Sequence, residues 1–273
     1  MISRNELIRA REALLDRTVR YFSARPEVLG IFVAGSLPAG TADAYSDIDL
    51  RVITTPAGHA RLVAERLDSP SQWGDLLFNE WLDGTEHCIS HFRPCLKIDV
   101  FYWSADAFRA SPWLKFPAII PLDRTGAVAQ VLKASADLPF ETVPDIEVSR
   151  VLSKALAGLH EVVRRVRRGE LVFAQTLLEE LRSNMIQLDG WLQRRIPTTP
   201  SDLKLEPAIS AGFRTALQAS YPPLDASAIE AAAIALSDAL HRQITDLHAT
   251  FEMRRSLADD LAAAEIVRNR QLE

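Results

Sequence analysis

Residues 32–53 read FVAGSLPAGTADAYSDIDLRVI. The segment begins inside a short apolar stretch, Val28–Ala34, which lies between a proline and Gly35 and is typical of a buried strand. A loop rich in Gly, Pro, Ser and Thr follows as far as Ser46. Polar and apolar residues then alternate over Asp47–Ile53, which indicates a second strand. The segment therefore predicts two strands joined by a polar loop.

Two carboxylates stand at the start of the second strand. Asp47 and Asp49 are two residues apart, and side chains at that spacing point to the same face of a strand. Adjacent like charges repel unless a cation lies between them, and carboxylate oxygens are ligands that suit Mg²⁺. The pattern predicts a metal site, with an exposed strand that carries two ordinary acids as the alternative.

A third acid interrupts an apolar strand further along the chain. Asp99 lies within the predicted strand Leu96–Trp103, between an isoleucine and a valine. Its side of that strand also carries Lys97, Phe101 and Trp103. A carboxylate in such surroundings is costly unless it has a partner. A metal ion or the reacting hydroxyl of a substrate would supply one.

The Gly35-Ser36 pair follows the first predicted strand directly. A glycine there lets the backbone approach a phosphate closely and permits a positive φ. The serine hydroxyl and the neighbouring N–H groups are then able to donate to phosphate oxygens. Gly and Ser are also the usual loop residues, so an ordinary loop is the alternative.

Taken together, Gly35-Ser36, Asp47-x-Asp49 and Asp99 resemble the signature of the polymerase-β-type nucleotidyltransferase superfamily. That signature is Gly-Ser, a loop, Asp-x-Asp and a third acid on a later strand. The helical pattern in the second half resembles the small-molecule branch, the aminoglycoside and lincosamide nucleotidyltransferases. The resemblance implies the α+β class: a mixed sheet with helices, followed by an all-α helical bundle.

The resemblance also implies roles for individual residues. Asp47 and Asp49 would hold Mg²⁺ on the triphosphate, and Asp99 would be the third catalytic carboxylate, as a metal ligand or as the base. The implied nucleotide-binding residues of the first half are Gly35, Ser36 and Ser46. Many relatives carry a basic residue after Gly-Ser, where this chain has Leu37-Pro38. Lys154 of the helical half is the predicted substitute.

The implied reaction moves a nucleoside monophosphate, AMP from ATP, onto a hydroxyl of a small molecule. An aminoglycoside-like or lincosamide-like antibiotic is the implied acceptor, and with it a role in antibiotic resistance. Mg²⁺ is the implied cofactor, and ATP or another nucleoside triphosphate is the co-substrate. The alternatives are a nucleotide-binding module without transfer activity, and nucleotidylation of a protein or RNA.

The sequence pattern changes character around residues 139–145, which predicts a catalytic domain over 1–140 and a helical domain over 145–273. The first domain is predicted to open with a helix over 3–22, started by a Ser3–Glu6 capping box. Its other predicted elements are a helix over 57–68 and strands over Leu76–Trp81, Glu86–Phe92 and Leu96–Trp103. The second is predicted to contain helices over 146–168, 171–194, 208–219 and 228–253, the last opened by Ser227-x-x-Glu230.

Composition limits the class of partner. The chain has 273 residues and a net charge of −5, which argues against a large nucleic-acid partner, since those need a basic footprint. No apolar run approaches the ~20 residues of a membrane span, and the N-terminal stretch is polar, so we expect a cytoplasmic protein without a membrane partner. A homodimer through the bundle is an alternative that periodicity leaves open.

Two further groups of residues invite interpretation. His87, Cys88, His91 and Cys95 have the composition of a zinc site, but their spacing on a strand favours ordinary strand residues. Arg150 and Lys154 lie one helical turn apart and are candidate ligand contacts. The arginines over 164–168 instead suit the end of a helix, where the helix dipole favours cations.

Overall fold

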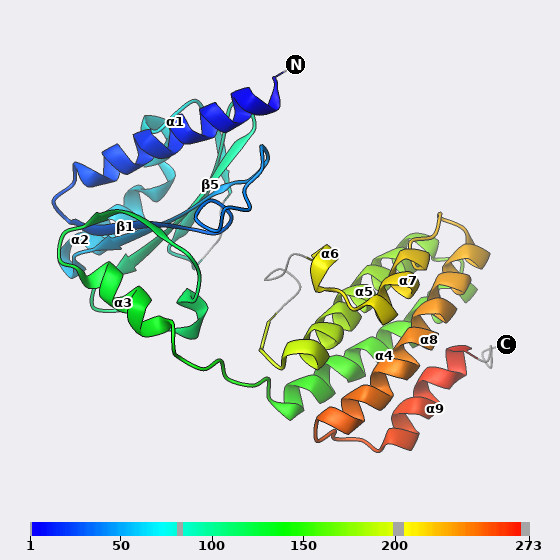
Figure 1. Cartoon of the computed structure of the whole chain (residues 1–273). Helices are drawn as coiled ribbons and strands as arrows, with labels where there is room; N and C mark the ends of the chain where they lie inside the picture. Colours follow the sequence, from blue (N-terminus) through cyan, green and yellow to red (C-terminus); the bar gives the residue numbers. More distant parts are fainter. Residues whose placement is uncertain (1, 81–83, 199–204, 269–273) are drawn as a thin grey trace. The chain divides into compact units, whose positions relative to one another are not determined.

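The computed structural model describes residues 2–80, 84–198 and 205–268 of the chain (Figure 1). The chain divides into two compact units, residues 1–140 and 141–273. Trp81, the last residue of one predicted strand, lies outside the described residues.

The described residues of the first unit form a mixed six-stranded sheet, in the order β3-β4-β5-β2-β1-β6. β2 and β5 run parallel, and the other neighbouring strands run antiparallel. The strands are β1 (Val28–Ala34), β2 (Ile48–Thr54), β3 (Leu76–Glu80), β4 (His87–Phe92), β5 (Leu96–Ser104) and β6 (Ile119–Asp123). Together with the helices described below, this sheet confirms the predicted α+β class.

Helices lie on both faces of this sheet (Figure 1). α1 (Arg4–Ser23) and α2 (Pro56–Ala64) pack on one face, where they share an apolar cluster with residues such as Ile31, Leu50 and Val100. α3 (Ala127–Ser135) packs on the opposite face, against Phe32 and Ile53. Because side chains alternate along β2, this second face also carries Asp49.

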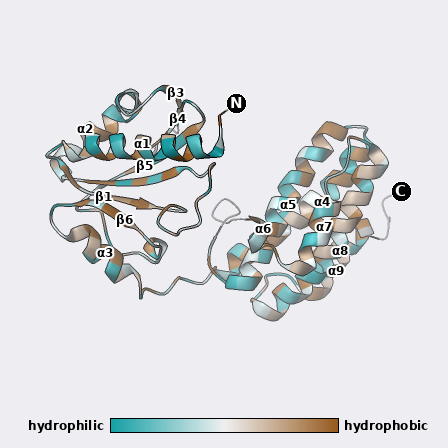
Figure 2. Ribbon diagram, turned by 45° about the horizontal axis from the view of Figure 1, so that its top comes forward, coloured by the Kyte–Doolittle hydropathy of each residue, from teal (hydrophilic) through white to brown (hydrophobic). Residues whose placement is uncertain are grey.

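α1 has the capping box that the sequence predicts. The Ser3 hydroxyl accepts from the Glu6 backbone N–H, and the Glu6 carboxylate accepts from the Ser3 backbone N–H. The buried stripe of α1 consists of Leu7, Arg11, Leu14, Thr18 and Phe22. Figure 2 shows hydrophilic and hydrophobic stretches alternating along this helix, as expected for an element with one buried face.

The second unit is helical throughout its described elements. These are α4 (Asp145–Arg167), α5 (Leu171–Arg194), α6 (Leu205–Ala208), α7 (Ala211–Ala219), α8 (Ala226–Thr250) and α9 (Leu257–Arg268). They enclose one apolar cluster, to which α4, α5 and α8 contribute most of the buried residues. The predicted all-α character of this half is confirmed. None of the described helices combines the length and apolar composition needed to cross a membrane.

The structure corrects three details of the predicted elements. β2 begins at Ile48, so Asp47 precedes the strand. α8 is capped by Asp225, whose carboxylate accepts from the Ala228 backbone N–H, and not by a box that starts at Ser227. A carboxylate is a strong N-cap because it also meets the positive end of the helix dipole. β6 and α3 are elements that the sequence pattern did not predict.

Candidate active site

The parallel pairing of β2 with β5 brings two of the predicted acids together. In this register Asp49 lies opposite Asp99, and Arg51 lies opposite Phe101. All four side chains share the face opposite the α1 core, while the residues between them, such as Leu50 and Val100, are buried in that core. The fold therefore brings two acids that are distant in sequence side by side in the middle of the sheet.

Gly35 makes room for one of these carboxylates. Its φ is +75°, a backbone conformation that residues with a side chain rarely adopt. A Cβ on Gly35 would lie 2.1 Å from Asp49 Oδ2, far inside van der Waals contact. Gly35 thus lies against a carboxylate, whereas the Gly-Ser motif predicts that this glycine lies against a phosphate.

Two cations offset the charge of the acids. Lys97 Nζ lies 2.8 Å from Asp47 Oδ2 and 3.1 Å from Asp99 Oδ2, so its ammonium bridges the two carboxylates. Arg51 Nη2 lies 3.9 Å from Asp49 Oδ1, and its guanidinium stacks over the Phe101 ring at 3.9 Å from the centroid. Each of the three acids therefore has a cationic neighbour.

Burial shapes the titration of this group. Removal from water raises the pKa of Asp49 and of Asp99, and the nearby Arg51 and Lys97 only partly oppose this effect. Burial also lowers the pKa of Arg51. Burial by itself would lower the pKa of the Lys97 ammonium as well. The hydrogen bonds from Lys97 to Asp47 and Asp99 outweigh that effect, so the pKa of Lys97 is raised.

The chemistry of the three acids fits a hard divalent cation, which prefers carboxylate oxygens. Asp99 Oδ1 is buried and makes no hydrogen bond within the described chain, so a polar atom there lacks a partner. In the described residues, however, no three His, Cys, Asp or Glu side chains form a ready metal cluster. The Lys97 ammonium already pairs with Asp47 and Asp99, so it would compete with a metal ion for these carboxylates.

The two predicted serines differ in their surroundings. Within the described residues, the Ser36 hydroxyl makes no hydrogen bond, whereas the Ser46 hydroxyl donates to Asp43 Oδ1 at 3.1 Å and accepts from the Asp43 N–H at 2.9 Å. Arg11 of α1 donates to the carbonyls of Asp43 and Ser46. In this structure Ser46 therefore stabilises the loop before Asp47 rather than facing a ligand.

An aromatic pocket adjoins the acids within the same unit. It has a volume of about 450 Å³, and its walls include Arg51, Phe101, Trp103 and Trp113. Arg51 and Phe101 lie one same-face step beyond Asp49 and Asp99, a separation of about 6.6 Å along the strands. Among the residues that the structure describes, no aspartate or glutamate lines the pocket, which is therefore suited to a flat, uncharged or anionic group.

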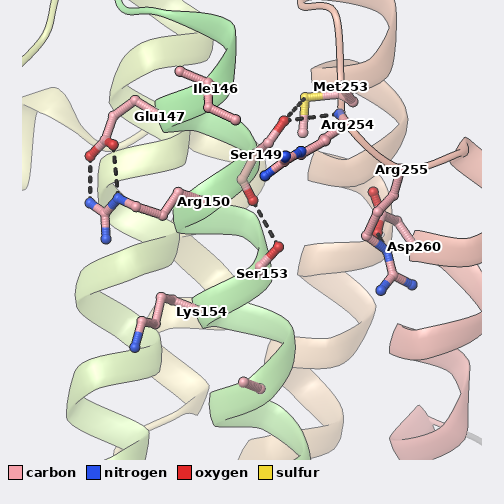
Figure 3. A pocket seen from close by; sticks show the side chains of 11 residues that line it. Ile146, Glu147, Ser149, Arg150, Ser153, Lys154, Met253, Arg254, Arg255 and Asp260 are labelled. Carbon is pink, nitrogen blue, oxygen red and sulfur yellow. Dashed lines mark hydrogen bonds and ion pairs between the residues drawn. The ribbon is translucent and has the colours of Figure 1, made fainter.

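Lys154 and Arg150 lie in the second unit, on α4. Both line a pocket formed by α4 and the segment that joins α8 to α9 (Figure 3). The predicted zinc candidates do not share one face: β4 turns the buried Cys88 away from His87 and His91, and Cys95 is exposed. Glu179 of α5 pairs with Arg182 at 2.7 Å and lines none of the described pockets.

The sequence interpretation missed three residues of the site. Lys97 and Arg51 each lie two positions from a predicted acid, on the same strand face, so strand periodicity contained the signal. Arg11 interrupts the apolar stripe of α1, and a buried cation is a sign of a specific partner. Its partners are the backbone carbonyls of Asp43 and Ser46, which the local sequence pattern around Arg11 does not predict.

Comparisons with known proteins add solved structures of similar fold. No protein-family profile matches the chain, and no curated protein matches it by sequence. One similar structure is an aminoglycoside 6-adenyltransferase from Bacillus subtilis, with 10% identity, 100% of both chains covered and a TM-score of 0.45. Another is a nucleotidyltransferase-like protein from Exiguobacterium sibiricum 255-15, with 15% identity, 88% of this chain and 77% of that chain covered, and a TM-score of 0.40. Because both identities are below 25% and both TM-scores are below 0.5, the function is argued from the chemistry of the site.

Proposed function

We propose that the chain is a nucleotidyltransferase that moves a nucleoside monophosphate, AMP from ATP, onto a hydroxyl of a small molecule. One observation carries the proposal: Asp49 and Asp99 are paired in register on adjacent strands, with Gly35 closing over the first and Lys97 linking the second to Asp47. Two partly buried acids, Asp49 and Asp99, lie side by side on one face of the sheet, and carboxylates whose pKa values are perturbed in this way gather at functional sites.

In this proposal each residue has a defined part. Asp47 and Asp49 would hold Mg²⁺, which when bound would neutralise charge on the triphosphate, and Asp99 would be a further ligand or would accept the hydroxyl proton. The Ser36 hydroxyl donates to a phosphate oxygen, since it has no partner in the described protein.

The transfer exchanges one bond at the α-phosphorus for another. The acceptor oxygen forms a bond to the α-phosphorus, the bond from that phosphorus to the bridging oxygen breaks, and pyrophosphate leaves. The hydroxyl proton goes to Asp99 or to water. Lys97, whose ammonium pairs with Asp47 and Asp99, would offset part of the negative charge of the phosphates.

The aromatic pocket supports a ring-bearing ligand at this site. Phe101 and Trp103 follow Asp99 on the same face of β5, so a group held there extends from the reacting phosphate along the strand. We assign the pocket to the nucleoside, whose base would stack on Trp113, an exposed ring of the pocket wall, and accept hydrogen bonds from Arg51.

A nucleotide-binding module without transfer activity is the second candidate. Leu37-Pro38 supplies no cation after Gly-Ser, and the described acids form no ready metal cluster. An RNA acceptor is disfavoured by the net charge of −5.

Calorimetric titration with ATP, GTP, CTP and UTP, with and without Mg²⁺, tests the proposal. The wild type should bind one of them only with Mg²⁺, and Asp49→Asn should lose that binding while Asp75→Asn, an exposed acid outside the site, keeps it. Mg²⁺-independent binding, or equal binding by both variants, contradicts the metal assignment. If the protein binds nucleotide but releases no pyrophosphate with any of a series of small-molecule hydroxyl acceptors, the nucleotide-binding module without transfer activity is favoured.

A further inference from the structure

A second pocket, in the helical unit, has a chemistry of its own. It has a volume of about 580 Å³ and lies between α4 and the Met253–Asp260 segment (Figure 3). Pockets of this size hold metabolites rather than a few water molecules.

Four cations and two carboxylates line this pocket, an excess of two positive charges in a chain that is acidic overall. Arg150 Nε donates to Glu147 Oε2 at 2.8 Å, and Arg255 Nε lies 2.7 Å from Asp260 Oδ1. Each acid of the pocket is thus committed to an arginine. Asp260 is further held by His248, at 2.9 Å.

Two cations remain available to a ligand. Within the described part of the chain, the side chains of Lys154 and Arg254 make no ion pair, and both belong to the pocket wall. The backbone N–H of Arg254 donates to Ser149 Oγ at 3.0 Å, which fixes the segment against α4. Lys154 lies on α4, and Arg254 lies on the segment between α8 and α9. The hydrogen bond from Arg254 to Ser149 holds this segment against the helix.

The ordinary explanation for helix cations does not apply here. The helix dipole favours cations in the last turn of a helix, and the arginines at the end of α4 follow that rule and pair with Glu161 and Glu170. Arg150 and Lys154 lie in the first half of α4, where the dipole offers no stabilisation. Repulsion between the pocket cations is then relieved only by water or by an anion.

We propose that this pocket binds a small organic oxyanion, a phosphate or carboxylate carried on a compact body. Lys154 and Arg254 neutralise the oxyanion, and the side chains of Ile146, Ala157 and Met253 contact the body. The proposal disfavours a polycation as the ligand, since the pocket has no spare acid. It is independent of the proposed transfer reaction and needs neither nucleotide nor Mg²⁺.

A matched series of sugars tests the charge preference. Calorimetry of the full-length protein in EDTA, without nucleotide, would compare glucose 6-phosphate and glucuronate with glucose and glucosamine, which share the ring and differ in charge. We expect at least one anion to bind at least about tenfold more tightly than glucose, and glucosamine to bind most weakly. An anion affinity no greater than that of glucose overturns the proposal.

Variants locate the binding site. Lys154→Glu and Arg254→Glu should each weaken binding of the favoured anion by about tenfold or more, because they replace attraction with repulsion at close range. Arg242→Glu makes the same charge change on α8, at a residue that lines no described pocket, and should leave the affinity unchanged. Equal losses in all three would mean that only net charge matters and would overturn the site.

The test separates this proposal from the proposed function. Asp49→Asn should bind the sugar anion as the wild type does, because Asp49 belongs to the other unit. A change of anion affinity in that variant, in either direction, would place the ligand at the acids and overturn the pocket assignment. Failure of Mg²⁺-dependent nucleotide binding would leave the pocket result untouched.

Discussion

The backbone conformation of Gly35 directly affects the position of a carboxylate in the candidate active site. It combines a positive φ with a Cβ position that Asp49 Oδ2 already occupies. We predict that Gly35→Ala abolishes Mg²⁺-dependent nucleotide binding and destabilises the fold by about 1–2 kcal/mol, the cost of a left-handed alanine. Calorimetry measures the first effect and denaturant unfolding the second.

Gly40 provides the control for that prediction. It lies in the same loop with φ +68°, and a Cβ there would meet nothing within 4 Å. Gly40→Ala should therefore cost about 1–2 kcal/mol of stability, no more than Gly35→Ala, and leave nucleotide binding intact. If both variants bind nucleotide equally well, displacement of Asp49 is not important for the site.

Asp99 offers a choice between two roles, which its isosteric amide distinguishes. If Asp99 is the base, Asp99→Asn should reduce the rate of pyrophosphate release by about 10²–10⁴-fold and leave the nucleotide Kd nearly unchanged. If it is a metal ligand, rate and affinity should fall together. Asp99 Oδ1 makes no hydrogen bond within the described chain, so this oxygen is available to a metal ion or to the hydroxyl proton.

At the scale of elements, β4 separates the two cysteines of the chain. Cys88 is buried on the core side of the strand, and burial raises the pKa of its thiol, whereas Cys95 is exposed beyond the strand end. Because only the thiolate reacts, a raised pKa leaves less of it at any given pH. We predict that iodoacetamide at neutral pH labels Cys95 alone, and that Cys88 reacts only after unfolding. Peptide mass spectrometry reads the result, and rapid native labelling of Cys88 would contradict the buried position.

Elements also show where local pattern is insufficient. The run Ile119–Asp123 contains Pro121, which argues against a central strand, and it is exposed along most of its length. It forms a strand because it lies at the sheet edge, beside β1, where a missing N–H is tolerated. Its edge position is a property of the sheet and not of the run, so the sequence did not predict it.

For the whole molecule, the buried apolar clusters of the described chain fall into separate units. One cluster lies within residues 143–267, and the other two lie within residues 7–128. We predict that Leu159→Ala, which empties a fully buried site in the bundle, destabilises the bundle by about 2–5 kcal/mol. Amide hydrogen exchange should lose protection in peptides of 141–273 and retain it in 1–140. Equal loss in both units would mean that they unfold as one.

Periodicity and end signals alone predicted β1, β5, α4, α5 and the capping box of α1 correctly, because each depends on residues within a few positions of one another. The three acids were also singled out from the sequence, Asp47 and Asp49 by their spacing and Asp99 because it interrupts an apolar strand. The sheet register that pairs Asp49 with Asp99, the Lys97 bridge and the pocket that joins Lys154 to Arg254 were decided only by tertiary structure. These contacts join residues far apart in the chain, and which of them meet depends on how whole elements pack, information that no local pattern contains.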